Sequence, residues 1–319
     1  MVFYYNNYYN IMFYKLRDWI PVEKLDWDFL SGNPNAIDLL AQNPDKINWK
    51  YLCVNPNAIS LIERELQNNP ESEKIHWYRL SANPNAISIL EKNPKIVNWS
   101  GLSENPNAIH LLEWQLTQDP DKIDWSGLSV NPNAIHLIER QLGQDPKKIN
   151  WYYLCANPNA IHLIERQMAQ DPKKINWSGL SGNPNAISIL KRYPEKIDYQ
   201  ELLRNPNAIH LLNPDKINWK YLSGNPNAIH LLEANVLKKN PKFIYFLEAN
   251  ILDSNEIYWC FWANLSNNPS IFTYDYIAIK NHRTSIKEEI IQYVNSPKQL
   301  AKWLQNECHT IEEFYELYG

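Results

Sequence analysis

Two short amphipathic blocks alternate along most of the chain, separated by the word NPNAI. Between Ile123 and Leu142, the first block places Ile123, Trp125 and Leu128 among polar and small residues. After NPNAI, apolar residues recur three and four positions apart with polar residues between them. This spacing matches the 3.6-residue period of a helix, so the second block is predicted to be an amphipathic helix.

The word NPNAI occurs nine times, and an aromatic residue stands six positions before each copy. The copies begin at Asn33, Asn55, Asn83, Asn105, Asn131, Asn157, Asn183, Asn205 and Asn225. The aromatic residues are Trp27, Trp49, Trp77, Trp99, Trp125, Trp151, Trp177, Tyr199 and Trp219. A degenerate tenth copy, WANLSNNPSIF, again places Trp262 six residues before Asn268. This self-similarity is typical of repeat architectures.

Both blocks carry signals for the start of a helix. An Asp or Asn precedes the aromatic residue in eight of the nine copies, His76 being the exception, and these residue types cap helices. In NPNAI, the first asparagine is expected to cap the second helix and the proline to occupy its first turn. Copies with a 26-residue step are longer by four residues than those with a 22-residue step, which is about one helical turn. The second helix is therefore expected to be longer in those copies.

A single repeat is too small to bury its own apolar residues, whereas stacked repeats bury them continuously. The sequence therefore predicts an all-α fold, a helical solenoid of the right-handed type with about ten short two-helix repeats of 20–28 residues and helical caps. We expect an N-terminal cap in residues 1–21, the solenoid in 22–239, and a degenerate repeat with a helical C-terminal cap in 240–319. Helices in that last region are expected at 284–291, from Ser296, and near Thr310. Stacked at ordinary helix spacing, the repeats would form an extended body on the order of 100 Å long.

Composition narrows the classes of function. The net charge of −4 disfavours binding to a phosphate backbone. The four cysteines, Cys53, Cys155, Cys260 and Cys308, form no CxxC pair, which is typical of reduced thiols inside a cell. The N-terminal stretch has no basic leader followed by an apolar core, and no uncharged apolar run is long enough to cross a membrane. We expect an intracellular protein with no membrane partner.

The repeat words resemble those of a family of proteins encoded in many copies by giant DNA viruses of amoebae. The resemblance rests on KLRDWIPVEKLDWDFLSGNPNAIDLL, on the repeated DKINWxxLSxNPNAIxLLE, and on the ending TYDYIAIKNHRTSIKEEIIQYVNSPKQLAKWL. It covers nearly the whole chain, which departs from the pattern at His76, at Tyr199 and in the 20-residue step after Asn205. The family is functionally uncharacterised, so the resemblance implies no catalytic residues. It implies a viral origin, with the host cytoplasm, a virus factory or the virion as the place of action.

One position of the predicted second helix lies on its polar face and varies between copies. This stripe, directly after NPNAI, consists of Asp38, Ser60, Ser88, His110, His136, His162, Ser188, His210 and His230. Zinc ligands lie about 2.0–2.1 Å from the metal, whereas neighbouring repeats are about 8–10 Å apart. A shared metal site is therefore disfavoured, and we expect no cofactor. We interpret the stripe as a solvated or inter-repeat hydrogen-bonding row and as a candidate partner-binding surface.

Two further rows suggest chemistry but favour simpler interpretations. The tryptophans could stack on single-stranded nucleic acid, yet each follows a helix cap and pairs with a leucine three residues later, as core residues do. A row of glutamates on the second helix indicates a solvated face, because carboxylates serve acid–base catalysis only in a cleft that excludes water. The row is Glu63, Glu91, Glu113, Glu139, Glu165 and Glu233. The second asparagine of NPNAI, as in Asn133 and Asn159, is hypothesised to hydrogen-bond along the stack.

The sequence thus favours a noncatalytic scaffold for protein–protein interaction, because a variable exposed position on a constant core suits selective binding. The partner would be an unidentified host or viral protein, and self-association remains open. One alternative is a structural or assembly component of a virion. The other, a nucleic-acid-binding repeat protein, is disfavoured by the acidic composition.

Overall fold

The computed structural model describes residues 14–240, 243, 256–281, 284 and 287–288. The chain divides into two compact units, Leu16–Phe272 and a second made of residues 1–15 with 273–319. The unit Leu16–Phe272, called the repeat unit below, is an all-α helical repeat solenoid, as the sequence predicted. The short strands β1 (Tyr14–Leu16) and β2 (Phe272–Tyr274) pair in a two-stranded sheet.

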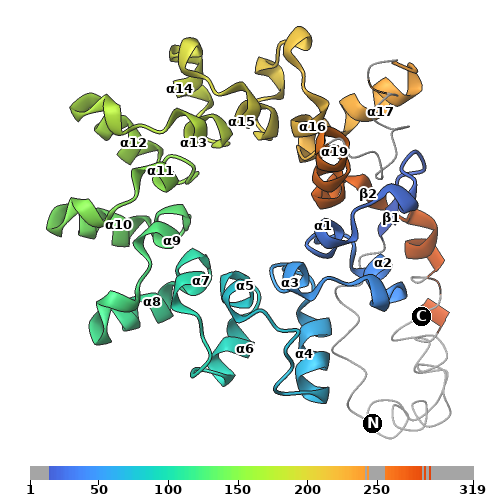
Figure 1. Ribbon diagram of the computed structural model, residues 1–319, viewed down its shortest axis with the longest axis horizontal. Coiled ribbons are helices and arrows are strands. Elements are labelled where there is room, and N and C mark those ends of the chain that lie inside the picture. The colour runs from blue at the N-terminus through green and yellow to red at the C-terminus, as the bar shows by residue number, and fades with distance from the viewer. Residues whose placement is uncertain (1–13, 241–242, 244–255, 282–283, 285–286, 289–319) are drawn as a thin grey trace, which may run out of the picture. The chain divides into compact units, whose positions relative to one another are not determined.

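Each repeat begins with a short first helix and continues into a second one. The first helices are α1 (Trp27–Ser31), α3 (Trp49–Leu52), α5 (Trp77–Ala82), α7 (Trp99–Glu104), α9 (Trp125–Val130), α11 (Trp151–Leu154), α13 (Trp177–Gly182), α15 (Tyr199–Arg204), α16 (Trp219–Leu222) and α19 (Glu256–Asn267). The second helices are α2 (Ile37–Gln42), α4 (Ile59–Asn68), α6 (Ile87–Lys92), α8 (Ile109–Gln118), α10 (Ile135–Gln144), α12 (Ile161–Gln170), α14 (Ile187–Arg192) and α17 (Ile229–Leu237). Within the repeat unit, Figure 1 shows the first helices on the inner side of a curve and the second helices on its outer side.

Short 3₁₀ segments complete many of the connections. They are η1 (Val22–Lys24), η2 (Pro44–Lys46), η3 (Pro120–Lys122), η4 (Pro146–Lys148), η5 (Pro172–Lys174), η6 (Pro194–Lys196), η7 (Ile209–Leu211), η8 (Pro214–Lys216), η9 (Pro226–Ala228) and η10 (Pro269–Ile271). The longer repeats extend the second helix as predicted, because α10 and α12 have ten residues whereas α6 and α14 have six. In the shortest repeat, the 3₁₀ segment η7 replaces the second helix.

The predicted caps of the first helices are present. Asp124 Oδ1 accepts hydrogen bonds from the backbone N–H groups of Ser126 and Gly127 at 2.9 and 3.3 Å. At the exceptional position, His76 Nδ1 accepts from the backbone N–H of Arg79 at 3.4 Å. His76 therefore caps α5 in place of the usual Asp or Asn.

The predicted start of the second helix is wrong by several residues. In the repeat around Asn131, the α-helix begins at Ile135, and the Asn-Pro-Asn-Ala segment before it forms a turn. Asn131 Oδ1 accepts from the backbone N–H of Asn133 at 3.0 Å, and the carbonyl of Asn131 accepts from the N–H of Ala134 at 3.2 Å. The asparagine thus holds a turn and not the first turn of the α-helix, which frees its amide group for the neighbouring repeat.

That amide group links each repeat to the preceding one. Asn131 Nδ2 donates to the carbonyls of Ser103 and Asn105 in the preceding repeat, at 3.0 and 2.8 Å. The same pair of bonds recurs in every repeat, and all ten asparagines are buried. We call this set the asparagine ladder: Asn33, Asn55, Asn83, Asn105, Asn131, Asn157, Asn183, Asn205, Asn225 and Asn268.

The ladder closes on itself, which an extended solenoid would not do. Asn33 of the first repeat donates to the carbonyls of Ser266 and Asn268 in the tenth repeat, at 2.8 and 3.0 Å. The backbone N–H of Asp26 also donates to Ser266 Oγ at 2.8 Å. Helix α1 packs against α19, as α5 packs against α7 and α13 against α15. Instead of two exposed ends, the repeat unit has a first and a tenth repeat that pack together.

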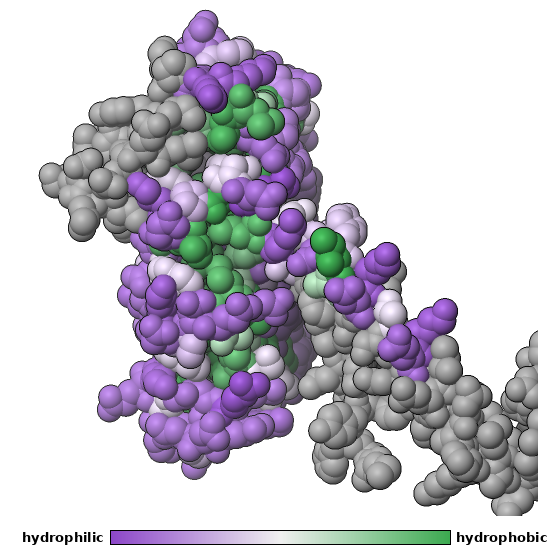
Figure 2. Space-filling model, turned by 90° about the vertical axis from the view of Figure 1, so that its right-hand side faces the viewer, coloured by the Kyte–Doolittle hydropathy of each residue, from purple (hydrophilic) through white to green (hydrophobic). Residues whose placement is uncertain are grey.

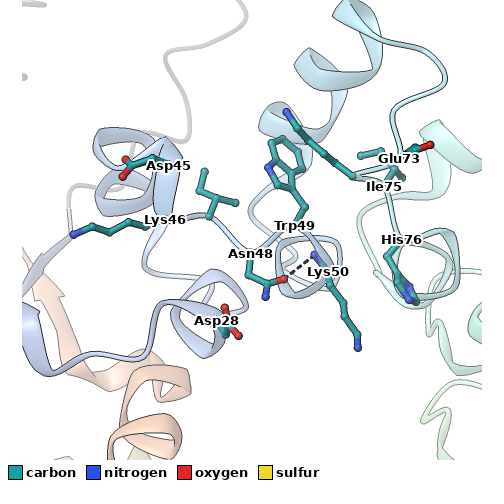
Figure 3. A pocket seen from close by; sticks show the side chains of 11 residues that line it. Asp28, Asp45, Lys46, Asn48, Trp49, Lys50, Glu73, Ile75 and His76 are labelled. Carbon is teal, nitrogen blue, oxygen red and sulfur yellow. Dashed lines mark hydrogen bonds between the residues drawn. The ribbon is translucent and has the colours of Figure 1, made fainter. Parts of the chain in front are cut away.

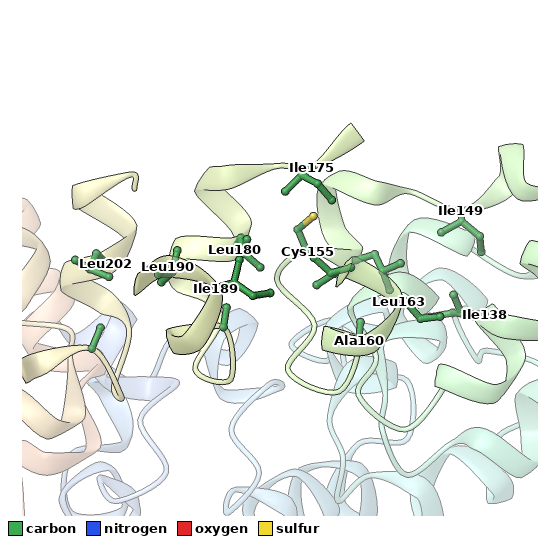
Figure 4. Close-up of a cluster of buried hydrophobic side chains, with 14 residues drawn as sticks. Ile138, Ile149, Cys155, Ala160, Leu163, Ile175, Leu180, Ile189, Leu190 and Leu202 are labelled. Atoms are coloured by element: carbon green, nitrogen blue, oxygen red, sulfur yellow. The ribbon is translucent and has the colours of Figure 1, made fainter. Parts of the chain in front are cut away.

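The core of the repeat unit lies between the first and second helices. Figure 4 shows one section of it, in which Ile138, Leu163, Leu180, Leu190 and Leu202 come from successive repeats and are buried. The alanine of every NPNAI word is fully buried, as are most of the leucines three residues after the aromatic position. The predicted core role of the tryptophans is confirmed for Trp125, Trp151 and Trp177, which are half-buried and pack against this cluster.

Figure 2 shows one face of the chain, on which apolar side chains gather in a strip bordered by polar ones.

Within the described ranges, no helix combines the length and the apolar character needed to cross a bilayer. The helices predicted from Ser296 and near Thr310 lie outside the described residues, as does most of the one at 284–291.

Candidate functional site

The predicted stripe lies on the second helices and 3₁₀ segments, and all nine of its residues are exposed. Its three consecutive histidines each contact a glutamate of the preceding repeat. His110, His136 and His162 place Nε2 at 3.3, 2.9 and 2.9 Å from a carboxylate oxygen of Glu91, Glu113 and Glu139. The inter-repeat hydrogen bonding predicted from the sequence is therefore present at these three positions of the stripe.

The same row continues without a histidine in the next repeat. Arg192 takes over the contact and places a guanidinium nitrogen 2.6 Å from Glu165 Oε1. In the part of the chain that the structure describes, no three His, Cys, Asp or Glu side chains lie close enough together to hold one metal ion. His110, His136 and His162 of the stripe thus form three separate exposed pairs with glutamates. The role of the stripe in partner binding stays a prediction.

An open hollow of about 570 Å³ lies among the first three repeats (Figure 3). Two of its lysines contact the tryptophans of the repeats. Lys46 stacks over the ring of Trp27 at 4.5 Å and Lys74 over that of Trp49 at 5.1 Å. Asn48 caps α3 by accepting from the backbone N–H of Lys50 at 3.0 Å. Acidic and basic side chains are mixed along the lining of this hollow. The lining therefore favours neither an anionic nor a cationic ligand.

Figure 3 also shows Trp49 and Lys50 pointing to opposite sides of α3. Trp49 is half-buried, whereas Lys50 is exposed. We call the two positions after the aromatic residue the first-helix pair. In chain order these pairs are Asp28–Phe29, Lys50–Tyr51, Tyr78–Arg79, Ser100–Gly101, Ser126–Gly127, Tyr152–Tyr153, Ser178–Gly179, Gln200–Glu201, Lys220–Tyr221 and Ala263–Asn264.

The second member of each pair lies near the preceding first helix. A Cβ on Gly101 would come within 2.1 Å of the Tyr78 carbonyl, so this glycine allows close packing of α7 on α5. Where the residue is large, it stacks on its neighbours instead. The Phe29 and Tyr51 rings are 5.3 Å apart, and the Arg79 guanidinium lies 5.0 Å from the Tyr51 ring. Side chains of three successive repeats therefore form one aromatic and cationic surface.

Tyr78 belongs to the same surface and is held by the next repeat. Its hydroxyl donates to Glu104 Oε1 at 2.7 Å. This hydrogen bond, burial and the negative charge of Glu104 raise the pKa of Tyr78 to about 12. The tyrosine therefore remains a neutral hydrogen-bond donor at physiological pH.

A second hollow, of about 360 Å³, lies where the ladder closes. We call it the notch; its lining consists of Phe29, Gln200, Arg204, Lys220, Tyr221, Cys260, Ala263 and Asn264. The Arg204 guanidinium and the Lys220 ammonium lie 4.8 and 5.4 Å from the Tyr221 ring. Four repeats contribute to this lining, which comes from the first helices α1, α15, α16 and α19.

The sequence analysis missed both the first-helix pairs and the notch. A signal was present, because these two positions change from repeat to repeat while Trp, Leu and NPNAI around them stay constant. They vary more in charge and size than the stripe does. The notch itself required the closure of the first repeat on the tenth, which no local pattern encodes.

No protein-family model, curated protein or solved structure matches this chain. The class that the structure defines is that of an all-α helical repeat solenoid.

Proposed function

We propose that this chain is a noncatalytic scaffold that binds another protein. The observation that carries the proposal is the contrast between the constant ladder and the variable first-helix pairs. Each repeat is fixed to the next by buried asparagine bonds, while the first-helix pair differs in residue type and in exposure. Tyr152 and Tyr153 are both exposed, whereas Phe29 and Tyr51 are half-buried. A repeat scaffold with a constant core and a variable surface suits selective recognition.

Aromatic and arginine side chains at such positions support protein binding. These residue types are enriched at the energetically important centres of protein interfaces. Tyr152 and Tyr153 are both exposed, with their rings 5.2 Å apart, and Arg79 lies over Tyr51. The stripe on the outer helices offers a second surface, which consists of Asp38, serines and histidines, three of which pair with glutamates.

The viral origin and the intracellular place of action belong to the same proposal. They are supported by the resemblance of the repeat words to those of giant-virus proteins. The partner would then be a host or viral protein present in the infected cell.

The test is affinity capture of the tagged full chain from infected cells, with two surface variants run in parallel. The first carries Tyr152→Ala and Tyr153→Ala in a first-helix pair, and the second carries His110→Ala, His136→Ala and His162→Ala in the stripe. We expect a discrete partner protein that one variant loses and the other retains. Recovery of only the chain itself, or of partners that nuclease treatment removes, would contradict the proposal.

A further inference from the structure

The notch exists because the tenth repeat carries small residues where its neighbours carry large ones. Its first-helix pair is Ala263–Asn264, whereas the flanking first helices contribute Tyr221 and Phe29. Asn264 Nδ2 donates to the backbone carbonyl of Lys220 at 2.8 Å, so this side chain is held down on α16. A hollow therefore remains between two aromatic walls.

Positive charge gathers on one wall of the notch. Arg204 and Lys220 both lie over the Tyr221 ring, which is half-buried. Arg204 Nη1 donates to Glu201 Oε1 at 2.7 Å, an exposed pair three residues apart. Lys220 makes no ion pair within the described part of the chain. One full positive charge is thus left at the edge of the hollow.

From these contacts we propose that the notch binds an acidic peptide segment of a partner protein that carries an apolar side chain. Carboxylates of the peptide pair with Lys220 and Arg204, and the apolar side chain enters the hollow left by Ala263 and Asn264. This inference rests on the proposed function as a protein-binding scaffold and names the chemistry of one partner segment. Such charge complementarity favours specificity and fast association.

The surroundings favour a peptide over a nucleic acid. Nucleic-acid binding neutralises several phosphates along a backbone, whereas Asp28 and Glu201 lie next to Phe29 and Gln200 of the notch lining. The chain as a whole carries a net charge of −4. A short acidic segment needs only Lys220, which has no ion pair in the described part of the chain, and the Arg204 guanidinium, which it would share with Glu201.

The test uses the full chain and fluorescence anisotropy with three labelled probes. The first is a peptide in which glutamates flank one phenylalanine, the second has glutamine in place of each glutamate, and the third is oligodeoxythymidine. The variant Lys220→Ala with Arg204→Ala removes the two cations. The matched control is Lys173→Ala with Lys174→Ala, which removes two exposed lysines from η5.

We expect the acidic peptide to bind, and both the loss of its charges and the loss of the two cations to weaken binding about tenfold. The control variant should bind like the unmodified chain. Equal binding of the glutamine peptide, no effect of the Lys220 and Arg204 substitutions, or tighter binding of oligodeoxythymidine would each overturn the proposal. A partner captured from cells equally well by the double variant would also overturn it, while leaving the scaffold proposal in place.

Discussion

The side-chain amide of Asn33 donates to the backbone carbonyl of Asn268, 3.0 Å away, and joins the first repeat to the tenth. The same bond joins Asn268 to Asn225 at 3.1 Å and continues through every repeat back to Asn33. An open solenoid needs capping repeats at both ends. Here each first helix has two neighbours, so the apolar faces of the first and tenth repeats cover one another.

The asparagine ladder should contribute strongly to stability. Asn131 makes three hydrogen bonds in a fully buried position, and Asn131→Ala leaves the two carbonyl acceptors without this donor. We expect the free energy of unfolding to fall by about 3 kcal/mol. The exposed Asn133 makes one inter-repeat bond, to the Pro106 carbonyl at 2.9 Å, and Asn133→Ala should cost about 0.5–1 kcal/mol.

Urea denaturation of the two variants measures this difference. Asn131→Asp serves as a control, because it keeps the acceptor oxygen for the Asn133 N–H but loses both amide donors. Equal effects of Asn131→Ala and Asn133→Ala would mean that the buried ladder is not the main link between repeats. No effect of Asn133→Ala and Asn159→Ala on thermal stability would reject the part played by the second asparagine.

Two glycines test the packing of the first helices. A methyl group at Gly101 would clash with the backbone carbonyl of Tyr78, whereas one at Gly143 meets no atom within 4 Å. Gly101→Ala should therefore destabilise the chain by about 2 kcal/mol or more through overpacking. Gly143→Ala lies near the end of α10 and should stabilise it by about 0.5–1 kcal/mol. Thermal unfolding of both variants should shift the midpoint in opposite directions, and a shift in the same direction would contradict the packing of α7 on α5.

The buried thiols should react slowly. Burial raises the pKa of Cys53 and Cys155, so fewer thiolates are present in the folded chain than in the unfolded chain at mildly alkaline pH. In a Cys308→Ser variant, we expect Ellman's reagent to modify Cys260 rapidly and the other two only as the chain unfolds. The raised pKa values also mean that stability declines as the pH rises through the range in which unfolded thiols ionise while the buried thiols stay protonated. Rapid modification of three thiols in folded protein would contradict their burial.

The histidine–glutamate pairs on the outer helices should add little stability. Both partners of each pair are about half exposed, as for His136 at 53% and Glu113 at 49%, and exposed ion pairs contribute about 0–1 kcal/mol each. Replacing His110, His136 and His162 by alanine should therefore lower the free energy of unfolding by less than about 1 kcal/mol per residue. Urea denaturation at low and high salt provides the measurement. A loss of several kcal/mol would show that the row stabilises the stack as the ladder does.

The sequence predicted the repeat, the first-helix caps and the amphipathic second helices because each depends on residues close together in the chain. The word NPNAI was harder to interpret, since Asn-Pro is also an ordinary helix start. The Asn131 amide has its partners 26 and 28 residues away, so its role appears only when repeats are stacked.

Closure was beyond the sequence for a related physical reason. It depends on the sum of small rotations between ten repeats, and no single residue records that sum. The degenerate words around Trp262 and Asn268 identified a tenth repeat but not its contact with the first. The notch, which that contact creates, could not be predicted for the same reason.

Closure is tested most directly by cross-linking the first repeat to the tenth. A Cβ at Gly32 would lie 3.6 Å from Asn267 Oδ1, so Gly32→Cys with Asn267→Cys places two thiols side by side. In a background with Cys260→Ser and Cys308→Ser, bismaleimidoethane should join them in the folded chain, as it should join Gly182→Cys to Glu201→Cys in neighbouring repeats. The pair Gly182→Cys with Asn267→Cys should stay unlinked. Linkage of the neighbouring pair without linkage of positions 32 and 267 would show that the solenoid is open and contradict the closed ladder.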